Sequence, residues 1–269
     1  MTYELPAAPL PIGGVLDSAI RLYRDSIRRW WTLVLLYSLI MGVFGVFWAL
    51  VSAKVAVSGI KDPRQVLAAM FSPAAMWGIA LAMVASLVFY GALMKALSAW
   101  AKGDKSLSLG SALAAGVRRL PGVLLGFLLN MLIIGIGLIL LVVPGVYFFG
   151  KLQLWMTAMF VDDVGAIEGF GISWRLTRGH WWRAATILTV GLIIVYVFAL
   201  VVGFVSGFLG GLTHLSVVNK AIVSQLLEVA TNMIVIPLSV TFLIAMYHDF
   251  KLRSEGGDLA ARMGALGKV

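Results

Sequence analysis

The chain has 269 residues, of which 61% are apolar and only 12% are charged. An average soluble domain carries roughly 25% charged residues, so this composition, with its mean hydropathy of +0.99, excludes a disordered chain and an ordinary soluble enzyme. Cysteine is absent, which excludes disulfides, thiolate metal sites and cysteine nucleophiles. We therefore expect an all-α integral membrane protein without a cofactor or a metal site.

The membrane-spanning stretches follow a short lead over residues 1–11, which holds three prolines and is predicted to be irregular. A helix needs about 20 mostly apolar residues to cross the bilayer core. We predict six such helices in a single membrane domain over residues 1–269: Trp31–Ala53, Ala75–Ala99, Gly122–Val143, Gly145–Val161, Ala184–Leu209 and Ala221–Tyr247. Pro144 and Gly145 separate the third from the fourth, which predicts a tight hairpin there.

Positive charge is sorted between the two ends of these helices. With six spans both termini share one face, which collects fifteen of the 21 Lys and Arg residues, whereas the opposite face has Lys54, Lys61, Arg64 and Lys220. Cytoplasmic loops carry such an excess, so both termini, including a tail over residues 250–269, are predicted to be cytoplasmic. Anionic lipid headgroups account for the basic excess, and no soluble basic module is present that would bind nucleic acid.

Three amphipathic stretches, 12–29, 106–120 and 164–183, each precede a predicted outgoing span. The first and third align without a gap. Asp17 meets Glu168, Tyr23 meets Trp174, Arg24 meets Arg175, Ser26 meets Thr177, and Trp30-Trp31 meets Trp181-Trp182. The chain is therefore predicted to consist of three units, each an interfacial helix followed by a helical hairpin.

Basic amphipathic helices lie in the headgroup plane, and tryptophan pairs anchor where a helix enters the bilayer. These residues are therefore candidates for contact with lipid headgroups or with the interface, with purely structural anchoring and snorkelling as the alternative. They are Arg24, Arg28, Arg29, Trp30, Trp31, Arg175, Arg178, Trp181, Trp182 and Arg183.

The run from Pro144-Gly145-Val146-Tyr147 through Lys151 and Asp162-Asp163 to Ser173–Arg183 resembles a bacterial family of membrane domains. That family includes the membrane domain found beside some glycerophosphoryl diester phosphodiesterases and stand-alone inner-membrane proteins. Ile12–Arg24 fits the same pattern, although Asp162 or Asp163 stands where the family usually has Glu. The resemblance implies a stand-alone protein of the bacterial inner membrane, without the phosphodiesterase catalytic domain and its activity.

Ionisable residues inside spans suggest functional sites. Lys151 and Glu228 lie at similar predicted depths in the outer half of the bundle, so they form a structural ion pair, belong to a transport site, or do not touch, with Lys151 snorkelling outward. Asn232 and Pro237 would belong to the same transport site, although we favour a plain helix kink at Pro237. Asp162-Asp163 either binds a cation or, as we favour, caps the helix that follows.

Two functions from different classes follow from these features. The first is a non-enzymatic membrane protein acting in envelope or lipid organisation through its basic interfacial helices, with anionic membrane lipids as partners. The second is a small transporter or channel for a solute, peptide or lipid, with its polar site in the outer half. A homo-oligomer or an unidentified membrane partner is compatible with both, and no enzyme motif is present.

Overall fold

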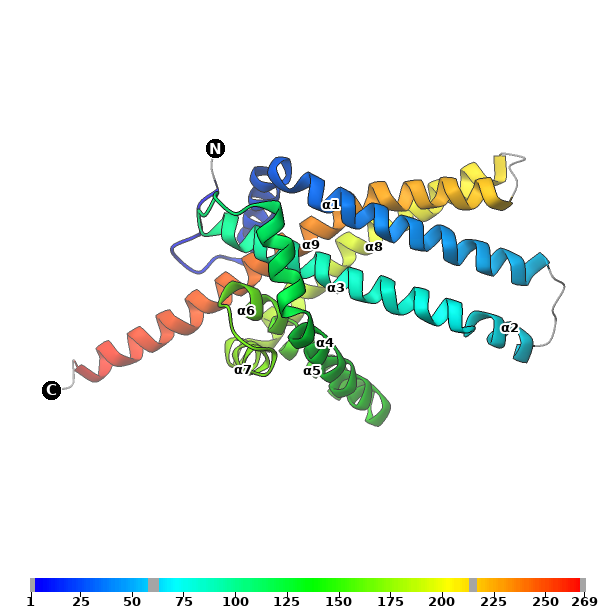
Figure 1. Ribbon diagram of the computed structural model, residues 1–269. Coiled ribbons are helices and arrows are strands. Elements are labelled where there is room, and N and C mark those ends of the chain that lie inside the picture. Colours follow the sequence, from blue (N-terminus) through cyan, green and yellow to red (C-terminus); the bar gives the residue numbers. More distant parts are fainter. Residues whose placement is uncertain (1–2, 58–62, 213–216, 267–269) are drawn as a thin grey trace.

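The computed structural model describes residues 3–57, 63–212 and 217–266, and this part of the chain forms helices without any strand (Figure 1). Residues 3–11 precede the first helix and are irregular, as predicted. The helices are α1 (Ile12–Val57), α2 (Pro63–Met70), α3 (Pro73–Ala101), α4 (Leu109–Leu140), α5 (Val142–Leu152), α6 (Trp155–Val161), α7 (Ala166–Leu176), α8 (Trp181–Leu212) and α9 (Val217–Leu266).

Within these described ranges, five helices are long and apolar enough to cross a membrane: α1, α3, α4, α8 and α9. Their outward faces carry large apolar side chains, among them Trp77, Phe204 and Ile139, which are 72%, 74% and 86% exposed. Soluble monomers rarely expose apolar patches of more than a few hundred Å². The fold therefore indicates a multi-pass membrane protein whose outer surface is solvated by lipid.

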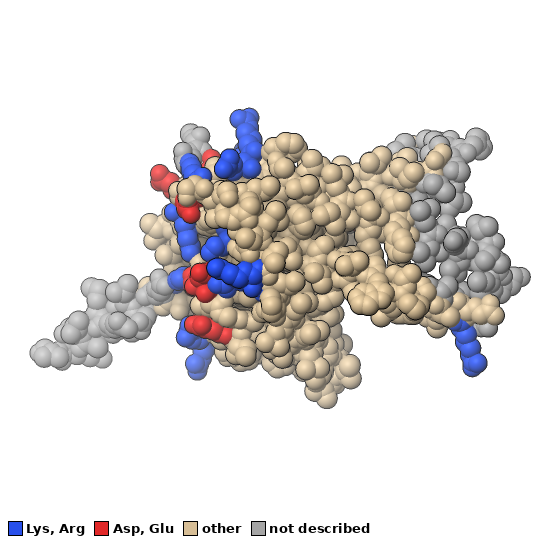
Figure 2. Space-filling view, in the orientation of Figure 1, with Lys and Arg blue, Asp and Glu red and all other residues tan. Residues whose placement is uncertain are grey.

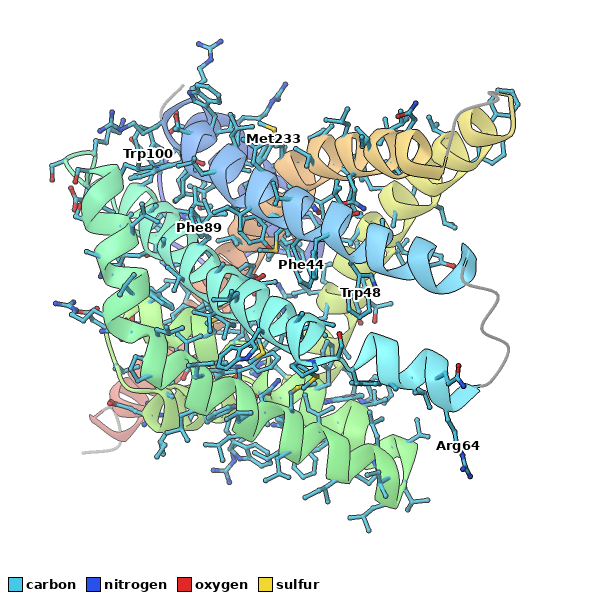
Figure 3. The ribbon with its side chains drawn as sticks, turned by 45° about the vertical axis from the view of Figure 1, so that its right-hand side comes forward. Phe44, Trp48, Arg64, Phe89, Trp100 and Met233 are labelled. Carbon is cyan, nitrogen blue, oxygen red and sulfur yellow. The ribbon has the colours of Figure 1, made fainter. Side chains whose placement is uncertain are left out.

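The three amphipathic stretches join their spans in different ways. The first is not a separate helix, because Ile12–Val57 is continuous and includes both the amphipathic stretch and the span. The second begins at the N-cap Ser108, whose hydroxyl accepts the backbone N–H of Ser111. It continues into the span as α4, which changes direction near the internal Pro121 (Figures 1 and 3). Only the third, α7, is a separate helix.

The predicted fourth span, Gly145–Val161, is not one helix. Two short helices, α5 and α6, replace it, with Gln153 and Leu154 between them. The hairpin turn also falls earlier than Pro144-Gly145, at the extended residue Leu141. Pro144 lies in the first turn of α5, where its missing N–H breaks no helical bond, and therefore it does not end a helix.

The predicted sixth span lies within α9, which passes through Pro237 without a break and continues to Leu266. The stretch 250–266 of the predicted tail therefore extends this helix. Both chain ends lie at the same end of the molecule, to the left in Figure 1, whereas the end of α1, α2, the end of α8 and the start of α9 lie at the other end. The buried core is concentrated near the end with the termini, where α1, α3, α6 and α9 meet.

Asp249, near the end of the span in α9, ties three segments together. Its side chain is 1% exposed and accepts hydrogen bonds from Arg183 Nη2 at 2.9 Å, from Arg253 Nε at 3.0 Å and from the backbone N–H of Leu10 at 2.8 Å. Both arginines also donate to the Leu10 carbonyl. The irregular lead, the first turn of α8 and the end of the span in α9 are thus held by one buried carboxylate.

Replacing Asp249 by Asn should lower the free energy of unfolding by about 3–5 kcal/mol, because two partly buried arginines lose the charge that compensates them. Unfolding of the purified protein in detergent, followed by circular dichroism, measures this loss. The matched control is Asp17→Asn, which breaks the exposed pair with Arg21 and should cost less than about 1 kcal/mol. Equal losses in the two variants would contradict a central role for Asp249.

Candidate functional site

Charged side chains gather at the end of the molecule that holds both termini, whereas the body beside it shows no charged side chain in this view (Figure 2). Arg64, on α2, lies at the opposite end from Trp100, which belongs to the charged end (Figure 3). The described part of the chain therefore has the charge asymmetry that the sequence predicts. We call this region, beside both chain termini, the charged end. Some of its residues are paired within the protein, and others are free to bind a ligand.

The turn between α6 and α7 presents two adjacent carboxylates to three other helices. Asp162 accepts from Lys251 Nζ at 3.0 Å and from the Tyr247 hydroxyl at 2.7 Å, both on α9. Asp163 accepts from Arg119 Nη2 on α4 at 2.6 Å and from Lys95 Nζ on α3 at 3.3 Å. The turn is thus a junction that fixes α3, α4 and α9 relative to one another.

The sequence predicts that Asp162 or Asp163 caps α7, and this prediction is wrong. The N-cap of α7 is Gly165, and no side chain accepts a hydrogen bond from the first turn of this helix. The carboxylate oxygens of Asp162 and Asp163 instead accept hydrogen bonds from basic side chains. No cluster of metal-ligating residues occurs among the residues that the structure describes. Burial acts to raise the pKa of Asp163, but Lys95 and Arg119 outweigh it, so that the pKa lies below its ordinary value of 3.8.

Because the folded pKa of Asp163 is depressed, its contribution to stability is present above pH 3.8 and is lost as the pH falls through the folded pKa. Asp163→Asn should therefore make the unfolding midpoint fall less steeply on acidification below about pH 4. Asparagine tolerates the positive φ of 64° at this position. The difference should stay below about 1 kcal/mol because the side chain is 57% exposed. Parallel pH profiles for the two proteins would contradict this assignment.

A small cavity, of about 210 Å³, lies beside this junction, and its lining includes Lys102, Asp162, Tyr247, His248 and Lys251. Lys102 Nζ donates to the Val161 carbonyl, and burial lowers the pKa of Lys102. His248 Nε2 lies 2.9 Å from the Pro6 carbonyl. Two lysines here face one carboxylate, so the cavity is suited to anions rather than to cations.

The stretch Ser173–Arg183, which carries the family resemblance, holds α5, α6 and α9 together. The Ser173 hydroxyl donates to the Lys151 carbonyl at 2.7 Å and accepts the Leu154 N–H at 3.2 Å, which bridges the break between α5 and α6. Gly179 has φ +76°, a conformation that favours glycine and that lets the chain turn from α7 into α8. The residues of this stretch that contact neighbouring helices therefore have a structural role.

Lys151 does not meet Glu228. Its side chain is buried, and its Nζ donates to the Thr177 carbonyl at 3.1 Å and lies 5.2 Å from the centre of the Trp174 ring. Glu228 is exposed on α9, and the described residues include no ion pair between the two. The reason is the broken fourth span, which places Lys151 against α7 near the charged end and not in the outer half of the bundle.

The other two residues of the predicted polar site lie on α9 with Glu228. Asn232 is half-buried, and Pro237 is buried within the helix. Within the part of the chain that the structure describes, neither residue has a side-chain contact that joins it to Lys151, so Lys151, Glu228, Asn232 and Pro237 do not come together. This removes the geometric basis for a shared transport site.

The predicted interface residues divide into two groups. Trp30, Trp181 and Arg183 are used inside the protein: Trp30 is 2% exposed, Trp181 stacks on Tyr147 and donates to its carbonyl, and Arg183 binds Asp249. These three are corrected from interface contacts to packing residues. The remaining seven are exposed: Arg24, Arg28, Arg29, Trp31, Arg175, Arg178 and Trp182.

The exposed arginines are free of carboxylate partners. Across the described ranges, the structure gives Arg24, Arg28, Arg29, Arg175 and Arg178 no ion pair, in contrast to Arg119, Arg183 and Arg253. Trp31 and Trp182, which are 50% and 79% exposed, stand next to these basic residues in sequence. The exposed set thus combines cationic heads with amphipathic rings, which is the chemistry of the membrane interface.

The alignment of the first and third amphipathic stretches also extends to their buried faces. Val15, Ser18, Leu22 and Ser26 are buried, and so are Ala166, Gly169, Ser173 and Thr177, which align with them. The hydroxyls of Ser26 and Thr177 each donate to the carbonyl four residues earlier. The two stretches therefore bury the same face and expose the same arginines, Arg24 and Arg175.

Asp249, Asp25 and Tyr247 were not recognised as important from the sequence. Asp25 accepts from Trp100 Nε1 at 2.8 Å and from the backbone N–H of Tyr3 at 3.2 Å. A signal was present for Asp249, because it stands at the end of an apolar span with Arg253 one helical turn later. No signal identified Asp25, whose partners lie on other segments.

The class that the fold indicates is a multi-pass helical membrane protein with one charged end. Residues 105–250 match the family described as a domain of unknown function (DUF7847), and since they make up more than half of the chain, the protein belongs to this family. The match begins just before α4 and ends one residue after Asp249. No curated protein and no solved structure matches the chain significantly.

Proposed function

We propose that this protein is a non-enzymatic protein of the bacterial inner membrane that binds anionic lipid headgroups through its interfacial helices and so acts in lipid or envelope organisation. The observation that supports this most directly is the set of exposed arginines without carboxylate partners, Arg24, Arg28, Arg29, Arg175 and Arg178, at one end of an apolar helical body. Each basic residue near an anionic surface contributes about 1 kcal/mol of attraction.

The proposed topology has six crossings in three units, with both termini in the cytoplasm. α1 with α3 and α8 with α9 are the outer pairs, and α4 pairs with the broken α5–α6 segment. The charge asymmetry supports this orientation. The resemblance to membrane domains of glycerophosphoryl diester phosphodiesterases stays a prediction and is not needed for the argument.

Transport is the less favoured function. Its motivation was a polar site shared by Lys151 and Glu228, and these residues do not come together. The arginines of the charged end, in contrast, are placed where headgroups lie in the proposed topology. We therefore propose lipid interaction rather than solute passage.

The quadruple variant Arg24→Gln, Arg28→Gln, Arg175→Gln, Arg178→Gln should bind anionic lipid about 1,000-fold more weakly, because about 1 kcal/mol is lost at each of the four positions. The measurement is native mass spectrometry of the purified protein titrated with phosphatidylglycerol, with phosphatidylcholine as the neutral comparison. All four side chains are exposed, so the fold should persist.

The matched control removes the same number of charges from the face that the sequence predicts to be opposite: Lys54→Gln, Lys61→Gln, Arg64→Gln, Lys220→Gln. It should keep the preference for phosphatidylglycerol. If both quadruple variants lose this preference equally, the effect is one of net charge, and specific binding by the interfacial helices is refuted.

The topology can be tested by single cysteines, since the chain has none of its own. Gln65→Cys on α2 should react with a membrane-impermeant maleimide in intact spheroplasts, whereas Lys105→Cys at the charged end should react only after permeabilisation. Val143→Cys, at the α4–α5 turn, should react from the outside if this hairpin crosses the membrane. The reverse pattern at positions 65 and 105 would overturn the orientation.

A further inference from the structure

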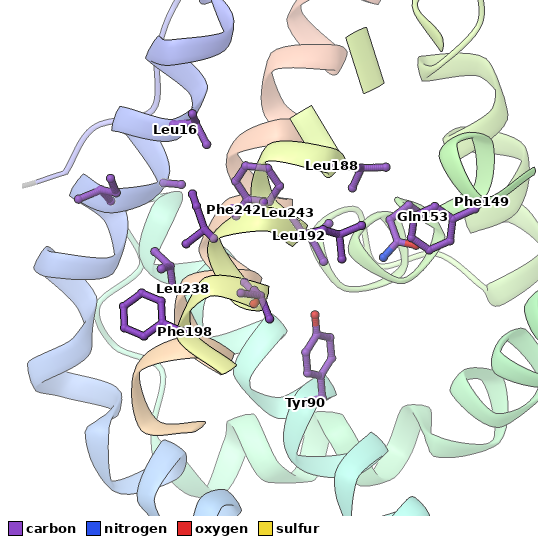
Figure 4. Close-up of a pocket in the computed structure, with 16 residues that line it drawn as sticks. Leu16, Tyr90, Phe149, Gln153, Leu188, Leu192, Phe198, Leu238, Phe242 and Leu243 are labelled. Atoms are coloured by element: carbon purple, nitrogen blue, oxygen red, sulfur yellow. The ribbon is translucent and has the colours of Figure 1, made fainter. Parts of the chain in front are cut away.

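A cavity of about 570 Å³ lies among α1, α3, α5, α8 and α9 (Figure 4). Ligand pockets in proteins generally measure roughly 300–1,000 Å³. Most of the lining is apolar, with Leu16, Leu192, Phe198 and Phe242 among its side chains. A cavity of this size with a mainly apolar lining is suited to an apolar ligand.

The depth of this cavity in the membrane indicates which molecules surround the protein there and can enter it. Leu243 and Leu238, both in the lining, precede Asp249 by six and eleven residues on α9, which at 1.5 Å per residue is about 9 and 16 Å from the charged end. Half of a bilayer core is about 15 Å thick. In the proposed topology the cavity therefore lies in the inner leaflet, at the depth of lipid chains.

Two polar groups interrupt the apolar lining. The Tyr90 hydroxyl, from α3, and the Gln153 amide, from the break between α5 and α6, are directed toward the same part of the cavity (Figure 4). The described residues provide no hydrogen-bond partner for either group, whereas Ser239, also in the lining, donates to the Val235 carbonyl. A polar side chain facing an apolar cavity without a partner is costly unless a ligand bonds to it.

We infer that this cavity binds one acyl chain of an inner-leaflet glycerolipid and that Tyr90 and Gln153 donate hydrogen bonds to an ester carbonyl of that lipid. Both side chains can donate to a carbonyl oxygen, and the apolar rest of the cavity lining matches the acyl chain of the lipid. The inference rests on the proposed membrane orientation but not on headgroup binding, because it concerns the chain and its ester. The cavity and the exposed arginines are thus two separate contacts with lipid.

The test uses the full-length protein in vesicles of phosphatidylcholine that contain a trace of the same lipid with a diazirine in one acyl chain. After illumination, mass spectrometry should locate the label on peptides of α8 and α9 that line the cavity. Ser239→Phe, which fills the cavity, should reduce labelling of these peptides at least ten-fold. Thr189→Phe, which adds the same ring on an exposed face of α8 outside the lining, should leave it unchanged.

The polar contacts are tested by Tyr90→Phe and Gln153→Met. Each should lower labelling about five-fold, the effect of one lost hydrogen bond, whereas Tyr196→Phe, a tyrosine outside the lining, should not. An ether-linked analogue of the probe lacks the carbonyl, so Tyr90→Phe should not change its labelling. Unfolding midpoints equal to that of the parent protein confirm that the variants fold.

Labelling spread evenly over exposed apolar residues, or unaffected by Ser239→Phe, overturns the inference. Equal effects of Tyr90→Phe on the ester and ether probes overturn the role of the ester. The quadruple arginine variant separates this inference from the proposed function, because it should lose its preference for phosphatidylglycerol and keep the labelling by phosphatidylcholine. If instead the parent protein has no such preference but labelling is confined to the cavity, headgroup binding fails and the cavity assignment stands.

Discussion

The buried carboxylate of Asp249 is the contact on which the arrangement of the charged end depends. A carboxylate that is 1% exposed requires compensation, and Arg183 and Arg253 supply it while also binding the Leu10 carbonyl. This arrangement fixes the irregular lead, the start of α8 and the end of the span in α9 in one place. The start of α8 and the span in α9 therefore have fixed positions relative to the lead.

Three further acidic residues of this end also serve as junctions. Asp162 and Asp163 fix α3, α4 and α9 around one turn, and Asp25 joins the lead to Trp100. Because these carboxylates pair with other groups inside the protein, they do not neutralise the exposed arginines of α1 and of the stretch 164–183. A structural use of the acidic residues thus creates the basic surface that the proposed headgroup binding needs.

The two proposed lipid contacts differ in physical origin. Arginines at the surface act through charge, which salt screens over about 8–10 Å. The cavity acts through apolar burial and two hydrogen-bond donors, which are independent of the headgroup and insensitive to salt. A protein with both contacts distinguishes lipids by headgroup at the surface and by chain linkage inside.

The charge asymmetry, the helical class and most of the spans could be predicted from the sequence. Their causes are local, because about 20 apolar residues form a helix in lipid wherever they occur. The burial pattern of the first and third amphipathic stretches also agrees with their alignment, since helical periodicity alone decides which face is apolar. The exposed arginines were likewise found from this periodicity.

The break in the fourth span and the partners of Lys151 were not predictable in this way. Hydropathy shows that residues 145–161 are apolar, but it does not show that Ser173 from another helix bonds to both sides of a break at Gln153-Leu154. Pro144 was read as a helix breaker, whereas in the first turn of α5 it breaks nothing. Once the span is broken, Lys151 lies against α7 and the predicted contact with Glu228 is lost.

The sequence by itself determined that this is a helical membrane protein with one basic end, because composition and periodicity act within single segments. Only the tertiary structure decided which charges are internal and which are free. Arg24 and Arg183 are alike in sequence, both being basic residues beside an apolar stretch. One is exposed and the other binds a buried carboxylate 66 residues further along the chain. That difference depends on long-range packing, which no local pattern records.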